Sequence, residues 1–362
     1  ESGSLSGRNQ IIIQLPNVHT ARFQAHNPTK TFPMKHTATF LATLFAALLL
    51  SACKSGKSAD KSTPAADLSA VRFNADSAFA FVKAQCDFGA RVPNSPAHDR
   101  CAAYIVAQFK RYGLQVQEQK TTLKGWDDKQ LKCNNIIASY RPELKDRIVL
   151  CSHWDSRPWA DADPDSSKHH EPVMAANDGA SGVAVLLEIA RQIKEINPSY
   201  GIDFVCFDTE DYGAPYWGKQ SPDQQDWCLG SHYWASHLPK GYKPRCGILL
   251  DMVGGSDARF PFEYFSMKYA QDVVARVWAA AAAVGADNLF VQDDGTMVED
   301  DHIPMNQIAG IPTIDIIPNT GTGFSETWHT TRDTPENISV DVLRGVGQTL
   351  IQFLHEENSR AK

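Results

Sequence analysis

The chain has 362 residues, of which 43% are hydrophobic, 10% aromatic and 21% charged. This is the usual balance of a globular protein, and it excludes an intrinsically disordered, collagen-like or coiled-coil chain. Thirty-five basic against 42 acidic side chains give a net charge of −7. Because proteins that neutralise nucleic-acid phosphates carry an excess of basic charge, we expect no nucleic-acid partner.

The first 70 residues have the composition of targeting segments. Met34 is the first methionine, and a short basic stretch and the apolar run 40–50 follow it. This order is typical of a secretory signal peptide, and the apolar run is too short for a membrane-spanning helix, which takes about 20 residues. The sequence Leu50-Ser51-Ala52-Cys53 resembles the bacterial lipobox, so we expect cleavage before Cys53 and a lipid on its thiol. The alternative is an ordinary cleavable signal with an incidental cysteine.

These patterns divide the chain into four segments. Residues 1–33 precede the expected start and are interpreted as an upstream leader or an artefact. Residues 34–52 are predicted to be the lipoprotein signal peptide, and the polar, Ser- and Lys-rich residues 53–70 a flexible, lipid-anchored tether. Residues 71–362 are predicted to form a single folded domain. We expect such a chain in the bacterial cell envelope, facing the periplasm or on the surface, attached to the membrane only through its lipid.

From residue 71 onward, helical and strand-like patterns alternate. Apolar residues recur at helical spacing in four stretches: 94–113, 182–196, 271–284 and 339–355. Between them lie short, nearly continuous apolar runs of the kind expected for strands covered on both faces: 148–151, 202–207, 247–250 and 313–317. The alternation, without an obvious linker, predicts the α/β class: a three-layer α/β/α domain around a central, twisted, mixed but mostly parallel sheet.

Polar residues follow these strands or precede the next helix. They are His153 and Asp155, Asp178, Glu210 and Asp211, Asp251, and His329. In an open α/β sheet, ligands bind at the carboxyl ends of the strands, so we expect these side chains to converge on one crevice. Imidazole and carboxylate are the ligands that zinc takes where thiolates are absent. Each residue alone is usually a helix cap or a loop residue, but the whole ordered set indicates a zinc site.

The order and spacing of these residues resemble the M28 zinc aminopeptidase family. The matching motifs are His-x-Asp at 153–155, Asp-Gly-x-x-Gly at 178–182, the paired acid at 210–211, then Asp251 and His329. Narrower motifs resemble the animal (type II) glutaminyl cyclases within that family: Asp300-Asp301-His302-Ile303-Pro304, Gly310-Ile311-Pro312 leading to Ile316-Ile317-Pro318, Trp328-His329-Thr330, and Tyr216-Trp217 through to Gly230-Ser231-His232. The resemblance covers about Phe73 to the C-terminus and implies the zinc aminopeptidase fold.

The resemblance implies a metal centre in this domain. One zinc ion per chain would be bound by Asp178, Asp211 and His329. The animal enzymes have glutamate where this chain has Asp211, and a shorter carboxylate requires the backbone to come closer to the metal. This difference leaves open a swap in which Glu210 binds the metal instead.

The resemblance also implies the acid/base and substrate residues. Glu210 would be the general acid/base, with Asp251 and Asp300 in an acidic hydrogen-bonded network around it. For this role the pKa of Glu210 must rise toward neutrality, and crowding by those two carboxylates in a partly dry pocket is a plausible means. The residues implied to line the substrate pocket are Trp217, Phe324 and Trp328.

The implied reaction cyclises the N-terminal glutamine of peptides or exported proteins to pyroglutamate, with release of ammonia. A zinc Lewis acid at the γ-amide and a carboxylate that shuttles one proton suit this chemistry. A di-zinc aminopeptidase, with His153 and Asp155 completing a second metal site with Asp251, is the alternative enzyme. A lipid-anchored binding protein without catalysis is the third possibility. The motif at His329 and the segment 300–304 favour the cyclase, and we expect a monomer.

Seven of the eight cysteines remain if Cys53 carries a lipid. An odd number in an oxidising compartment leaves at least one free thiol. Cys151 and Cys206 lie inside predicted strands, so we expect them to be small apolar core side chains. No disulfide pairing is assigned from the sequence.

Overall fold

The central sheet has six strands in the order β1-β2-β4-β3-β5-β8. Their bounds are β1 Gln115–Lys124, β2 Gln130–Tyr140, β3 Arg147–His153, β4 Gly201–Phe207, β5 Cys246–Leu250 and β8 Thr313–Ile316. The four strands β4, β3, β5 and β8 are parallel, whereas β1 pairs with β2, and β2 with β4, in antiparallel orientation. The sheet is therefore mixed around a parallel centre, which confirms the predicted fold class.

This computed structural model describes residues 67–219, 224–319 and 323–361. These residues fall in one compact unit. The expected leader, the signal peptide and the lipidation residue Cys53 lie outside the described residues and stay predictions. No described helix has the length and apolar character that a membrane span requires.

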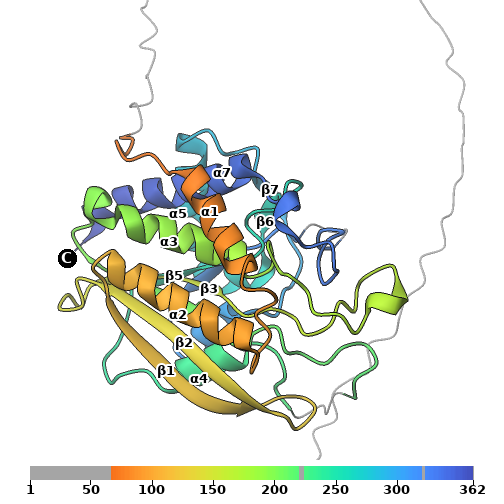
Figure 1. Cartoon of the computed structure of the whole chain (residues 1–362). Coiled ribbons are helices and arrows are strands. Elements are labelled where there is room, and N and C mark those ends of the chain that lie inside the picture. The colour runs from red at the N-terminus through yellow and green to blue at the C-terminus, as the bar shows by residue number, and fades with distance from the viewer. Residues whose placement is uncertain (1–66, 220–223, 320–322, 362) are drawn as a thin grey trace, which may run out of the picture. The chain divides into compact units, whose positions relative to one another are not determined.

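Helices cover both faces of the sheet. Figure 1 shows α1, α2 and α3 over one face, and α5 and α7 pack into the same hydrophobic layer. The smaller helices α4 and α6 pack on the opposite face. The helix bounds are α1 Ala75–Cys86, α2 Pro96–Arg111, α3 Ala180–Ile196, α4 Leu229–Ser236, α5 Tyr264–Ala283, α6 His302–Gln307 and α7 Val340–Glu356. A separate parallel pair joins β6 Phe260–Phe262 and β7 Phe290–Asp294, and short 3₁₀ turns lie at Ser166–Lys168, Pro335–Asn337 and Glu357–Arg360.

Successive side chains of the central strands point into the two layers in turn. In β3, Ile148 and Leu150 pack with the larger helical layer, whereas Val149 and Cys151 pack with α4 and α6. Every residue of β3 and of β4 is buried. The prediction of strands covered on both faces is therefore confirmed, as is the expectation that Cys151 and Cys206 are core side chains.

The predicted helices are present, with shifted ends. Ser95 caps α2 by accepting a hydrogen bond from the backbone N–H of His98, and Pro96 occupies the first turn. Helix α5 begins at Tyr264 rather than at 271, because Glu263 caps it there, and its backbone leaves helical geometry at Ala270. That break interrupts the apolar spacing, so the sequence pattern reveals only the second part of the helix.

Candidate metal centre and active site

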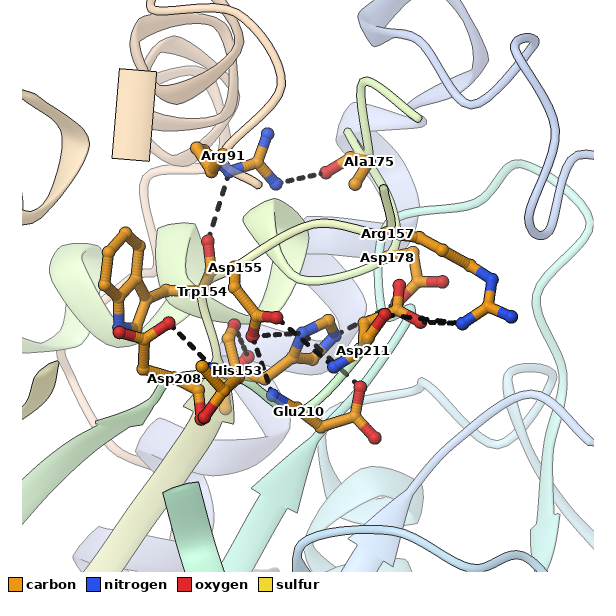
Figure 2. A network of polar contacts seen from close by, with 12 residues as sticks. Arg91, His153, Trp154, Asp155, Arg157, Ala175, Asp178, Asp208, Glu210 and Asp211 are labelled. Carbon is orange, nitrogen blue, oxygen red and sulfur yellow. Dashed lines mark hydrogen bonds and ion pairs between the residues drawn. The ribbon is translucent and has the colours of Figure 1, made fainter. Parts of the chain in front are cut away.

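The predicted polar residues meet at the carboxyl ends of the parallel strands. His153 is the last residue of β3, and its Nε2 lies 3.0 Å from Asp178 Oδ1 and 3.2 Å from Asp251 Oδ1. Asp251 directly follows β5. Figure 2 shows His153, Asp178 and Glu210 close together, although they come from separate parts of the chain. The predicted convergence on one crevice is therefore observed in the structure.

Asp155 fixes the turn that presents Glu210 and Asp211. Its two carboxylate oxygens accept hydrogen bonds from the backbone N–H groups of Glu210 (3.1 Å) and Asp211 (3.2 Å). The preceding Thr209 has a left-handed backbone, with φ of 54°. In this structure the carboxylate of Asp155 therefore holds the backbone that carries Glu210 and Asp211.

A tight turn before α3 presents Asp178. Asp333 accepts hydrogen bonds from the backbone N–H groups of Asn177 (2.8 Å) and Asp178 (3.0 Å). Gly179 follows with φ of 100°, and a Cβ there would lie 2.9 Å from both Asp155 O and His153 Cε1. Only glycine fits this turn without displacing the neighbouring site residues.

Asp178, Asp211 and His329 form a buried group suited to a metal ion. One ligand atom from each lies within 4.8 Å of the others. His329 Nε2 is 3.3 Å from Asp211 Oδ1 and 3.6 Å from Asp178 Oδ2. Oδ2 of both aspartates is buried without a hydrogen-bond partner. Because a buried carboxylate oxygen without a partner is costly, and because zinc takes imidazole and carboxylate ligands, these three residues fit a zinc ion.

A second group of possible ligands adjoins the first. His153, Asp178 and Asp251 also bring ligand atoms within 4.8 Å of one another. Asp178 belongs to both groups. In this second group the Nε2 of His153 already contacts an oxygen of each aspartate.

A pocket with a volume of about 240 Å³ opens onto this centre. It is lined at its polar end by Asp178, Glu210, Asp211, Asp251, Asp300 and His329, and by the apolar side chains of Trp227, Met252, Val298, Ile317, Phe324 and Trp328. The rings of Phe324 and Trp328 lie 4.8 Å apart, and Trp328 stacks on His329 at 3.6 Å. The structure thus brings two of the three predicted substrate-binding residues to the pocket.

Trp217 is the exception, because it is not among the residues that line this pocket. Its side chain is 37% exposed and packs against His170 at 4.7 Å instead. Trp227, ten residues further along, lines the pocket in its place and lies parallel to His329 at 6.0 Å. No sequence pattern marks Trp227; its place follows from a contact of the folded chain, in which the next residue, Cys228, donates its backbone N–H to the carbonyl of Glu210 at 3.0 Å.

Glu210 has the environment of an acid/base group. Burial raises its pKa well above the usual range; His153 opposes this effect, and the carboxylates of Asp211 and Asp300 add to it. The thiol of Cys228 lies 3.3 Å from Glu210 Oε1 and donates to it. The crowding expected from Asp300 is therefore present.

Further carboxyls extend this acidic region. Burial, and next the charge of Asp251, raises the pKa of Asp300 to about 7. Burial also raises the pKa of Asp251, and it raises that of Asp301 well above its usual range, with Asp300 as the next cause. Asp251 and Asp300 are both buried and both line the pocket beside Glu210.

All seven described cysteines are buried and free. The expected free thiol is thus consistent with the structure, and no pairing arises among the described residues.

Known proteins resemble the chain in sequence and structure. The model of peptidase family M28 matches residues 135–354. The crystal structure of Bacteroides thetaiotaomicron glutaminyl cyclase bound to N-acetylhistamine is 46% identical, with a TM-score of 0.78, over 79% of this chain and 99% of that one. Bovine (Bos taurus) glutaminyl-peptide cyclotransferase is 25% identical over 73% of this chain and 79% of its own length. Aminopeptidase YwaD of Bacillus subtilis is 28% identical over 68% of this chain, which spans about half (49%) of that longer protein. The chain belongs to peptidase family M28.

Proposed function

We propose that the protein is a zinc-dependent glutaminyl-peptide cyclotransferase, which converts N-terminal glutamine of peptides or exported proteins to pyroglutamate. The observation that carries this proposal is a small pocket with apolar walls that opens onto the buried Glu210, whose pKa is raised by that burial, beside a three-residue metal group. The similarity to a solved bacterial cyclase over 99% of that chain supports it.

The reaction is an internal transfer within one residue. The α-amine of the glutamine attacks its own γ-amide carbon, the bond from that carbon to the amide nitrogen breaks, and ammonia leaves. A zinc ion held by Asp178, Asp211 and His329 would supply a Lewis acid toward the amide oxygen. Glu210 would accept the proton of the attacking amine and return it to the leaving nitrogen. A carboxylate with a raised pKa suits both halves of that transfer.

The pocket walls suit a small substrate side chain. Trp227, Phe324 and Trp328 form apolar sides that exclude water, while Asp300 lies beside Glu210 at the polar end.

A di-zinc aminopeptidase is the second candidate, because the group of His153, Asp178 and Asp251 offers a second metal position. We propose one zinc per chain instead. Asp211 Oδ2, which belongs only to the first group, is buried without a hydrogen-bond partner. In the second group the Nε2 of His153 lies 3.0 and 3.2 Å from the two carboxylates, closer than the 3.3 and 3.6 Å that separate His329 Nε2 from the carboxylates of the first.

The test compares two peptides that differ only in their first residue, glutamine or leucine, with zinc-loaded protein and mass detection. We expect loss of one ammonia from the glutamine peptide and no change in the leucine peptide. Release of the first residue from either peptide would identify an aminopeptidase, and an unchanged pair would identify a binding protein. Elemental analysis of the same sample gives the zinc content per chain.

We also propose that the chain is a monomeric lipoprotein of the bacterial cell envelope, facing the periplasm or on the surface. The signal-like run ending at Cys53 supports this location. Expression of the wild type and of Cys53→Ala in a bacterial host tests it: the wild type should be found with membranes and incorporate a labelled fatty acid, and the variant should not. Unlabelled wild-type protein would contradict the proposal. Light scattering of the soluble domain gives the oligomeric state.

A further inference from the structure

Arg157 is a buried cation directly beside the metal group. Its side chain is 1% exposed. The Nε and Nη2 atoms each donate to one oxygen of Asp161 at 2.6 Å, which makes a two-pronged pair. The remaining nitrogen, Nη1, lies 3.1 Å from Asp211 Oδ1 and 3.3 Å from the carbonyl of Asp211 (Figure 2). One guanidinium thus holds both the side chain and the backbone of a proposed metal ligand.

The same pair reaches a second ligand through Asp161. Asp161 Oδ1 lies 3.5 Å from Nδ1 of His329. This is the ring nitrogen opposite Nε2, the one that faces Asp178 and Asp211. A carboxylate at Nδ1 favours the tautomer with its proton on Nδ1, which leaves the lone pair on Nε2 free for a metal.

An aromatic layer holds the guanidinium in place. Arg157 lies over the ring of Trp227 at 4.7 Å and near that of Trp159 at 5.5 Å. Trp227 in turn stacks parallel to His329. The guanidinium therefore has little freedom to move without moving a pocket wall.

The charges of the pair also suit a cation site. A lone guanidinium at this place would repel a metal ion. The carboxylate of Asp161 neutralises this charge at close range, so Arg157 can orient Asp211 without adding net positive charge to the site. The contact also suits the short side chain of Asp211. Nη1 of Arg157 donates a hydrogen bond to Oδ1, and Oδ2 has no hydrogen-bond partner.

We propose that Arg157 and Asp161 are positioning residues of the metal centre: a charge-neutral pair that fixes Asp211 directly and His329 through its outer nitrogen. This inference rests on the proposed metal ligands, but not on the reaction that they serve.

The test measures zinc affinity by competition with a chelator, in the full domain. Arg157→Met removes the contacts to Asp211 and Asp161, and we expect zinc binding to weaken by about 10- to 100-fold, as is usual for groups that orient metal ligands. Arg157→Lys keeps the charge but loses the planar fork, so zinc binding should weaken there as well.

Arg147→Met is the matched control. Arg147 is another buried arginine, paired with Asp203 through two contacts of 2.7 and 2.6 Å, at the opposite end of β3 from His153. Its loss should lower the melting temperature but leave the zinc affinity unchanged.

Wild-type zinc affinity in both Arg157 variants would overturn the proposal. Equal weakening in Arg147→Met would also overturn it, because the effect would then follow general destabilisation. A wild-type domain that binds no zinc would overturn the metal centre itself. The last outcome is distinct from the first two, in which the wild type binds zinc.

Discussion

Glu210 combines burial, neighbouring carboxylates and a thiol donor, and its chemistry can be separated from metal binding by one isosteric change. In Glu210→Gln the side chain keeps its size but can no longer take up a proton. We expect turnover to fall by about 100- to 10,000-fold with the zinc content kept. Glu118→Gln, on the edge strand β1, is a control that should retain activity. Loss of zinc from Glu210→Gln would mean that Glu210 and Asp211 have exchanged roles.

Alanine substitutions of two tryptophans in one segment should differ in their effect on kcat/KM. Trp227 lines the pocket, whereas Trp217 packs against His170. Trp227 is half-buried in this pocket wall, and covering an aromatic side chain contributes about 1.5–3 kcal/mol, so Trp227→Ala should lower kcat/KM by about 10- to 100-fold. Trp217→Ala should change it little. Steady-state kinetics on one glutamine peptide compares the two, and a larger loss in Trp217→Ala would contradict the position of the pocket described above.

The sequence predicts some site residues better than others. Asp178, Glu210 and Asp211 are predictable because they follow strands or precede a helix in a recognisable order. Trp227 and Arg157 are not, because their roles depend on contacts between distant segments: the loop after β3, the segment before α4, and His329. No local pattern marks such contacts before the chain is folded.

At the level of elements, the turn into α3 sets the position of Asp178. Gly179→Ala would bring a Cβ to 2.9 Å from Asp155 O and His153 Cε1. We expect a loss of about 1–3 kcal/mol of unfolding free energy and weaker zinc binding. Denaturant unfolding and chelator competition measure the two effects.

Gly241→Ala separates the strain of a left-handed backbone from the contacts that the added Cβ makes at Gly179. Gly241 also has a left-handed backbone, with φ of 84°, but a Cβ added there would meet no atom within 4 Å. It should lose about 1 kcal/mol from backbone strain alone and keep wild-type zinc affinity. Equal effects in the two variants would show that the contacts at Gly179 do not matter.

The secondary structure elements are predictable where burial is continuous. The four parallel strands are apolar on both faces, so their runs are evident in the sequence. The antiparallel strand β1 is polar and alternates between exposed and half-buried residues, so its sequence resembles a loop. Helix α1 is also not evident from the sequence, because its burial depends on the packing of α3 and α7 against it.

For the whole molecule, the acidic centre links stability to pH. Burial raises the pKa of Asp300 and of Asp333 to about 7, with Asp251 and Asp178 respectively as the next causes. Without zinc, the folded chain therefore keeps protons that the unfolded chain releases above about pH 4, so unfolding free energy falls as pH rises from 4 to 7.

We expect the melting temperature of the zinc-free protein to fall by several degrees between pH 5 and pH 8. A bound cation offsets the repulsion among these carboxylates, so the zinc-loaded protein should lose less. Thermal melts of chelator-treated and zinc-loaded samples across this range measure the difference. A zinc-free melting temperature that rises with pH would contradict the assignment.

The proposed ligands are spread widely along the chain, and this has a consequence for biogenesis. Asp178 and Asp211 come from its middle, whereas His329 follows the last strand of the sheet. A nascent or clipped chain that ends before His329 lacks one of the three ligands, even if β3 and β4 have already paired. Metal capture would thus be a late event in maturation, and zinc would stabilise only chains whose C-terminal part has docked onto the sheet.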